Sequence, residues 1–164
     1  MPKMEELIER IHTLCLKTKL TLATAESCTG GRLASLLTSI SGASNVFRSG
    51  VIAYSADCKT SLLGVSADLI TKHTVVSSEV AEAMACGVTQ LIKADIGLAT
   101  TGIAGPTGGT KQTPVGSVWI ALNYREKTSS RLLHLSGNRA EIIEQTCHEL
   151  LTELRQMLQT LADE

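Results

Sequence analysis

Aromatic residues, net charge and long apolar runs are all scarce in this sequence of 164 residues. Phenylalanine, tryptophan and tyrosine together make up 2% of the chain, so few side chains could stack on nucleic-acid bases. The formal net charge is −1, so the chain has no basic excess with which to bind a phosphate backbone. We therefore expect no nucleic-acid partner and a core built from aliphatic residues.

Membrane and metal signals are missing as well. No apolar run approaches the roughly 20 residues of a membrane-spanning helix, and the polar stretch 1–10 is unlike a signal peptide. The five cysteines form no C-x-x-C pair, and the four histidines are not paired at ligand spacing. Scattered cysteines of this kind are typical of a reducing cytosol. We expect a cytoplasmic protein with no membrane partner, no metal and no cofactor.

What the chain does contain is an alternation of helical and strand patterns. Apolar residues at helical spacing predict helices over 4–15, 29–40, 57–63, 77–91 and 138–161. Short apolar segments predict strands over 20–25, 49–55, 95–101, 115–124 and 129–135, the last two as an antiparallel pair. This order predicts a single three-layer α/β/α domain over residues 1–164 with a mixed, largely parallel sheet.

Three polar segments directly follow predicted strands, where ligands bind in open α/β sheets. The first, 26–31, places Ser27 on a strand-to-helix turn before Thr29, Gly30 and Gly31. Amides at such a helix start can bind a phosphate or stabilise an oxyanion. Alternatively, Ser27 or Thr29 is only a helix cap. Cys28 is a rival nucleophile, which we rank below Ser27 because no histidine is placed to act as its base.

The second segment carries Tyr54 at a strand end and Lys59 five residues later. A lysine kept neutral by burial can serve as a base for a serine hydroxyl, and a nearby tyrosine can hold or pass the proton. The simpler interpretation is a surface lysine and a tyrosine at the sheet edge.

The third segment is a glycine-rich loop that begins near Thr101 and continues through Gly102, Gly105 and Gly108. Its backbone amides could surround a ligand, although it has neither the Walker A ending nor the G-x-G-x-x-G spacing. Compact domains seldom keep a loop of about 13 residues without a use. We therefore favour a ligand-binding loop over a plain connection.

Taken together, these segments resemble the CinA C-terminal domain family, over about residues 5–160. The resemblance is carried by residues 24–31 (TAESCTGG), Gly50 with Tyr54, Ser55 and Lys59, residues 64–65 (GV), 76–77 (VS), 101–106 (TGIAGP) with Gly108 and Gly109, 114–118 (PVGSV) and 137–139 (GNR). Each motif is weak alone, and the combination is specific.

The resemblance implies a metal-independent serine amidohydrolase that converts nicotinamide mononucleotide to nicotinic acid mononucleotide and ammonia, in pyridine nucleotide recycling. By position, Ser27 matches the nucleophile, Lys59 the general base and Tyr54 an assisting hydroxyl. Thr101 matches a hydroxyl beside the reacting amide, and Arg139 a phosphate ligand. The substrate-binding residues expected on this basis are Thr29, Gly30, Gly31, Gly102, Gly105, Gly108 and Arg139.

Two positions depart from the family pattern. Asn138 replaces an aspartate beside Arg139, and Thr113 stands where a lysine usually precedes the PVG motif, with Lys111 nearby as a substitute. The resemblance also implies a homo-oligomer, a dimer or larger, with a pyridine mononucleotide as the small-molecule partner. The alternative function is a catalytically weak nucleotide-binding module, or a competence- or damage-related member of the family.

Overall fold

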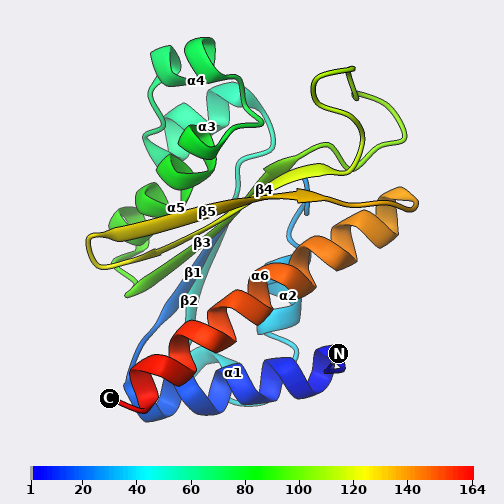
Figure 1. The fold of residues 1–164 in the computed structure, drawn as a ribbon. Coiled ribbons are helices and arrows are strands. Elements are labelled where there is room, and N and C mark those ends of the chain that lie inside the picture. Colours follow the sequence, from blue (N-terminus) through cyan, green and yellow to red (C-terminus); the bar gives the residue numbers. More distant parts are fainter. Residues whose placement is uncertain (1) are drawn as a thin grey trace.

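A five-stranded sheet lies between two layers of helices in the computed structural model, which describes residues 2–164 (Figure 1). The strands are β1 (Leu22–Glu26), β2 (Phe47–Ile52), β3 (Ile96–Gly102), β4 (Ser117–Tyr124) and β5 (Lys127–His134). The helices are α1 (Met4–Thr18), α2 (Arg32–Leu37), α3 (Ala56–Leu63), α4 (Ala67–His73), α5 (Ser78–Ile92) and α6 (Arg139–Ala162), with a 3-10 turn η1 (Ala43–Asn45).

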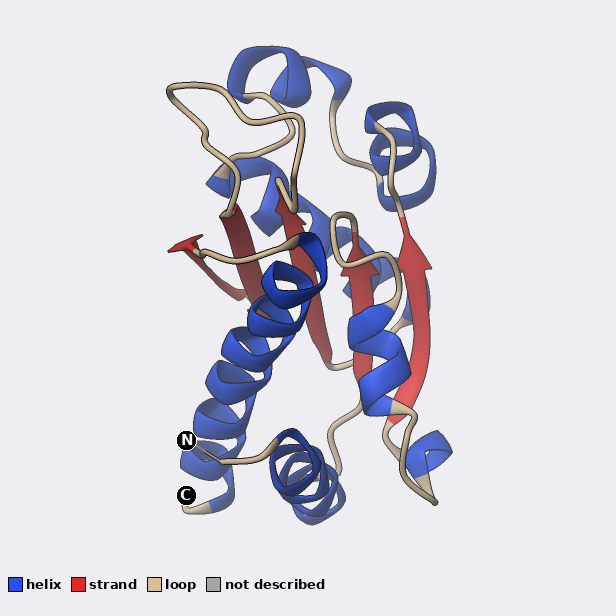
Figure 2. Ribbon diagram, turned by 90° about the vertical axis from the view of Figure 1, so that its right-hand side faces the viewer, coloured by secondary structure: helices blue, strands red, loops and turns tan. Residues whose placement is uncertain are grey.

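The strand order places several chain segments at one edge of the sheet. The order is β2-β1-β3-β4-β5, with β1 parallel to β2 and β3, and with β4 antiparallel to β3 and β5. All strands except β4 therefore point the same way, and their carboxyl ends meet at one edge. Figures 1 and 2 show α3, α4 and the long connection from β3 to β4 at this end.

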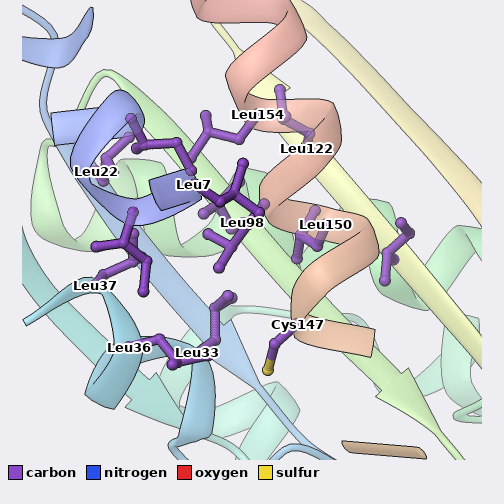
Figure 3. Close-up of a cluster of buried hydrophobic side chains, with 14 of the residues drawn as sticks. Leu7, Leu22, Leu33, Leu36, Leu37, Leu98, Leu122, Cys147, Leu150 and Leu154 are labelled. Carbon is purple, nitrogen blue, oxygen red and sulfur yellow. The ribbon is translucent and has the colours of Figure 1, made fainter. Parts of the chain in front are cut away.

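The two faces of the sheet are covered differently. Helices α1, α2 and α6 pack on one face over a leucine-rich core, which confirms the expectation of an aliphatic interior (Figure 3). Helix α5 covers the other face, where the sheet presents Ala23, Ala25, Ala99 and Ala121, and α3 and α4 pack against α5. These small residues let α5 approach closely, and a Cβ on Gly97 would lie 2.3 Å from the carbonyl oxygen of Ala85.

The predicted fold class is confirmed, and so are two helix starts. Asn138 caps α6 in a reciprocal capping box with Glu141, and Ser77 caps α5 by accepting the Val80 N–H. Helix α4 was not predicted because none of its residues is buried, so it carries no apolar stripe. Within residues 2–164, no helix combines the length and the apolarity needed to cross a bilayer.

The predicted helix over 29–40 is wrong in its bounds, because α2 covers only Arg32–Leu37. Residues 28–31 instead form a turn in which Gly30 and Gly31 have φ values of +57° and +101°. Glycine adopts this left-handed region at little cost, so the pair bends the chain out of β1 before the helix begins. This turn carries Ser27 at its entrance.

We expect Leu98→Ala to lower the free energy of unfolding by about 2–5 kcal/mol, since Leu98 is fully buried in β3 and its loss leaves a cavity. The matched control is Leu91→Ala on α5, where the leucine is 53% exposed and the loss should stay within about 0.5 kcal/mol. Urea unfolding of both variants measures the difference, and equal losses would contradict this assignment of the core.

Candidate active site

A pocket of about 290 Å³ opens where the carboxyl ends of β1, β2 and β3 meet. Its lining residues come from all three polar segments that follow the strands and from the start of α6: Ser27, Cys28, Tyr54, Ala56, Lys59, Val75, Thr101, Gly102, Ile103, Ala104, Gly105, Thr107, Gly108 and Arg139. Two larger depressions lie near the β4–β5 turn, and neither contains Ser27 or Lys59. The pocket at the strand ends is therefore the candidate active site.

The centre of this pocket is a contact between a serine and a lysine. The Nζ atom of Lys59 donates a hydrogen bond to Ser27 Oγ at 2.9 Å and another to the carbonyl oxygen of Ala53 at 2.9 Å. Ser27 follows directly after β1, while Lys59 lies on α3, which begins shortly after the neighbouring strand β2 ends. The parallel pairing of β1 and β2 thus brings together two residues that are 32 positions apart.

Lys59 is 1% exposed, and no carboxylate of residues 2–164 forms an ion pair with it. Burial disfavours the charged ammonium and lowers the pKa of Lys59 below its ordinary value of 10.5. The neighbouring thiols of Cys28 and Cys58 oppose this shift of the pKa only when they are ionised. A lysine amine that loses its proton in this position can accept the Ser27 hydroxyl proton.

Cys28 also lines the pocket, and its environment argues against a nucleophilic role. Burial raises the pKa of the Cys28 thiol to about 12, although nearby hydrogen bonds and Lys59 favour the thiolate. The thiolate is the reactive form of cysteine, and at neutral pH this side chain stays a thiol. The structure thus supports the ranking of Ser27 above Cys28.

Arg139, the first residue of α6, crosses the mouth of the pocket. Its Nη2 atom donates to the Tyr54 hydroxyl at 2.6 Å, and its Nη1 atom donates to the Gly105 carbonyl oxygen at 2.8 Å. Tyr54 is 56% exposed, and its hydroxyl contacts Arg139 rather than Ser27 or Lys59. The Tyr54 hydroxyl therefore makes no direct hydrogen bond with Ser27 or Lys59 through which it could assist proton transfer between them.

The glycine-rich segment forms one wall of the pocket. Thr101 is 1% exposed, and its hydroxyl donates to the carbonyl oxygen of Val75 at 2.8 Å. Gly102 permits close strand pairing, because a Cβ there would lie 2.6 Å from the Ser117 carbonyl oxygen. Gly108, with a φ of +90°, lines the pocket farther along the loop.

Three of the predicted substrate-binding residues, Thr29, Gly30 and Gly31, do not line the pocket. The amides of Leu33 and Ala34 at the start of α2 donate to the carboxylate of Glu26, at 2.8 and 3.0 Å. The first turn of this helix therefore already holds an anion from its own chain.

Glu26 and Val75 contact predicted site residues, although the sequence predicts no role for either. A carboxylate as the last residue of a fully buried strand is a signal that could have drawn attention to Glu26. No comparable signal marks Val75, since its contact with Thr101 uses only a backbone carbonyl. Across residues 2–164, no three His, Cys, Asp or Glu side chains gather as ligands for a metal ion.

Comparison with known proteins identifies the family. The model of the CinA C-terminal domain matches residues 4–158. The chain belongs to the CinA family. It is 46% identical over 154 residues to a protein of Thermoanaerobacter pseudethanolicus named as competence-damage inducible, and 47% identical over 138 residues to a CinA-like protein of Kosmotoga olearia. These matches cover 94% and 84% of this chain.

Solved CinA structures share the whole fold. A competence damage-inducible protein from Klebsiella pneumoniae superposes with a TM-score of 0.93 at 32% identity, over 96% of this chain and 98% of that one. A competence/damage inducible protein from Agrobacterium tumefaciens gives 0.90 at 37% identity, over 98% and 97%. By contrast, the chain spans only 37% of the Thermoanaerobacter protein and 34% of the Kosmotoga protein.

Replacing Lys59 with methionine tests the lowered pKa of its amine. Between the folded-state pKa and 10.5, the unfolded lysine binds a proton that the folded one does not, so wild-type stability rises with pH in this window. We expect the free energy of unfolding of wild type, relative to Lys59→Met, to increase as pH rises from neutral toward 10.5. Urea unfolding of both proteins measures this difference, and a constant difference would contradict the shift.

Proposed function

We propose that this chain is a metal-independent serine amidohydrolase that converts nicotinamide mononucleotide to nicotinic acid mononucleotide and ammonia. The observation that carries the proposal is the 2.9 Å contact between Lys59 Nζ and Ser27 Oγ inside a pocket at the strand ends. The substrate follows from membership of the CinA family and from the resemblance in motifs. In this role the chain returns pyridine nucleotides to NAD synthesis.

The first half of the reaction forms an acyl-enzyme. Neutral Lys59 accepts the proton of Ser27 while Oγ attacks the carboxamide carbon of the substrate, and a tetrahedral oxyanion forms. The proposed donors to this oxyanion are backbone N–H groups of the loop that follows Thr101, where Ala104, Gly105, Thr107 and Gly108 line the pocket. A single donor to such an oxyanion typically contributes about 2.7–4 kcal/mol to lowering the barrier.

Collapse of the tetrahedral oxyanion completes the acyl-enzyme, and the second half of the reaction then hydrolyses it. The Lys59 ammonium returns its proton to the amide nitrogen, the C–N bond breaks, and ammonia leaves the Ser27 ester. Water then gives a proton to Lys59 as its oxygen attacks the ester carbon. The C–O bond to Ser27 breaks, Oγ recovers the proton, and the carboxylic acid product leaves. One buried amine thus acts as base and acid in both halves.

The other end of the substrate is an anionic phosphate, for which Arg139 is the proposed ligand. A guanidinium has five N–H donors, and two of its nitrogens already contact Tyr54 and Gly105, which places the group firmly at the pocket mouth. The two departures from the family pattern leave this arrangement intact. Asn138 caps α6 as an aspartate would, and Thr113 closes a turn with Thr110.

We expect Ser27→Ala to abolish ammonia release from nicotinamide mononucleotide, because within residues 2–164 no other hydroxyl contacts Lys59. The variant should still bind the nucleotide in calorimetry, because the alanine removes only the hydroxyl oxygen. Ammonia is measured with purified protein in the presence of EDTA.

Full activity of Ser27→Ala would contradict the proposed mechanism. Nucleotide binding by the wild type without ammonia release would indicate the binding module instead. A loss of wild-type activity in EDTA that an added metal restores would contradict the metal-independent assignment.

Arg139→Gln tests the phosphate contact. We expect KM for the mononucleotide to rise about tenfold or more with a smaller change in kcat, since a charged hydrogen bond is worth about 1.5–3 kcal/mol. For nicotinamide riboside, which has no phosphate, the same substitution should change KM little. The matched control is Arg131→Gln, because Arg131 pairs with Glu149 and Glu153 on α6, outside the pocket. An equal rise in KM for both substrates would contradict the assignment.

A further inference from the structure

Glu26 is a buried charged residue that the proposed reaction does not use. It is the last residue of β1, it is 1% exposed, and it does not line the pocket. Side chains alternate between the two faces of a strand, so Glu26 and Ser27 leave the backbone on opposite sides. Glu26 contacts α2, whereas Ser27 contacts Lys59 on α3. The carboxylate therefore lies on the opposite side of the backbone from the proposed nucleophile and contacts the turn and helix that follow it.

The carboxylate of Glu26 accepts three hydrogen bonds. Oε1 accepts from the Thr29 hydroxyl at 2.6 Å and from the Leu33 N–H at 2.8 Å, and Oε2 accepts from the Ala34 N–H at 3.0 Å. All three donors follow Ser27 in the chain, so the Glu26 side chain ties the turn after Ser27 and the start of α2 back to the end of β1. A buried carboxylate needs such partners, because an unpaired charge away from water is costly.

The Thr29 hydroxyl extends this network to β3. Since its one proton goes to Glu26, the Thr100 hydroxyl must donate to Thr29, across 2.8 Å. The carbonyl oxygen of Thr100 in turn accepts the Ser27 N–H at 3.0 Å. The backbone of Ser27 is thus held from β3 at the residue that also supports Thr29.

The backbone of Glu26 reaches the other member of the pair. Its carbonyl oxygen accepts the Ala53 N–H at 2.8 Å, and the Ala53 carbonyl oxygen accepts from Lys59 Nζ at 2.9 Å. Glu26 therefore connects to Ser27 through the chain itself and to Lys59 through a single residue, Ala53. A shift of Glu26 would move both reacting groups.

We propose that Glu26 is a positioning residue that sets the alignment of Ser27 Oγ with Lys59 Nζ. The inference rests on the proposed function only in taking Ser27 as the nucleophile and Lys59 as its base. Glu26 also occupies the Leu33 and Ala34 amides, so no ligand anion can use them. An anionic substrate group is consequently left to the Arg139 end of the pocket.

Glu26→Gln is the decisive variant, because it keeps the shape of the side chain. Its amide oxygen can still accept from Thr29 and Leu33, but its NH₂ group would face the Ala34 N–H, which loses its acceptor. We expect kcat for the mononucleotide to fall roughly ten- to a hundredfold with KM changed less than about threefold, since small misplacements of reacting groups act on kcat.

If Glu26 only stabilised the fold, a folded Glu26→Gln variant would keep the wild-type kcat. A fall in kcat with KM nearly unchanged therefore indicates positioning. Circular dichroism at the assay temperature checks folding, and a folded Glu26→Gln with wild-type kcat overturns the proposal. Thr29→Val removes the connecting hydroxyl and should lower kcat in the same direction. Its matched control is Thr146→Val, which removes an equally buried hydroxyl that bonds only within α6 and should leave kcat unchanged.

A second readout does not depend on the substrate. Phenylmethylsulfonyl fluoride sulfonylates an activated serine: the Oγ–S bond forms, fluoride leaves, and the base takes the proton. Mass spectrometry of the wild type and Glu26→Gln gives the rate of Ser27 modification, and we expect the variant to react at least tenfold more slowly.

The two proposals can therefore fail separately. Equal modification rates for wild type and Glu26→Gln overturn the positioning role even when ammonia release confirms the amidase. Rapid modification of wild-type Ser27 without ammonia release from the mononucleotide overturns the proposed function, and slower modification of Glu26→Gln would then still support the positioning role. A wild type that neither releases ammonia nor reacts with the fluoride overturns both.

Discussion

A lysine amine held away from water, without a counter-charge, is the constraint on which the rest of the site depends. Lys59 packs beneath the pocket with two oxygen partners, Ser27 Oγ and the Ala53 carbonyl, and neither is an anion. Neutral oxygens stabilise the ammonium less than an anion would, so burial lowers the pKa of Lys59. A carboxylate at this position would stabilise the ammonium and oppose the effect of burial on the pKa.

The sheet topology is what makes this burial possible. Because β1, β2 and β3 are parallel, their carboxyl ends deliver three polar segments to one edge, and α3 covers that edge from one side. The helix start at Arg139 reaches the same edge because β5, antiparallel to β4, also ends there. The amino acids of the site thus come from regions spread over most of the chain.

Polar groups at this edge are divided between two tasks. On the α2 side, Glu26, Thr29 and Thr100 bond to one another and to the backbone, and they form a closed polar cluster with no free helix amide in it. On the α3 side, Ser27 and Lys59 face the pocket. The amino terminus of α2, which local sequence suggested as an anion site, is therefore occupied by Glu26 of the same chain.

The sequence by itself determined the fold class, the aliphatic core, the start of α6 and the three strand-end segments, because these depend on local periodicity and on short-range patterns of polar residues. Tertiary structure decided the rest. Whether Lys59 is exposed or buried depends on where α3 lies relative to the strand ends, because there Lys59 contacts Ser27 and Ala53. Whether the start of α2 is open to a ligand depends on Glu26, which accepts hydrogen bonds from the Leu33 and Ala34 amides. Burial and pairing arise between distant segments, so no local pattern encodes them.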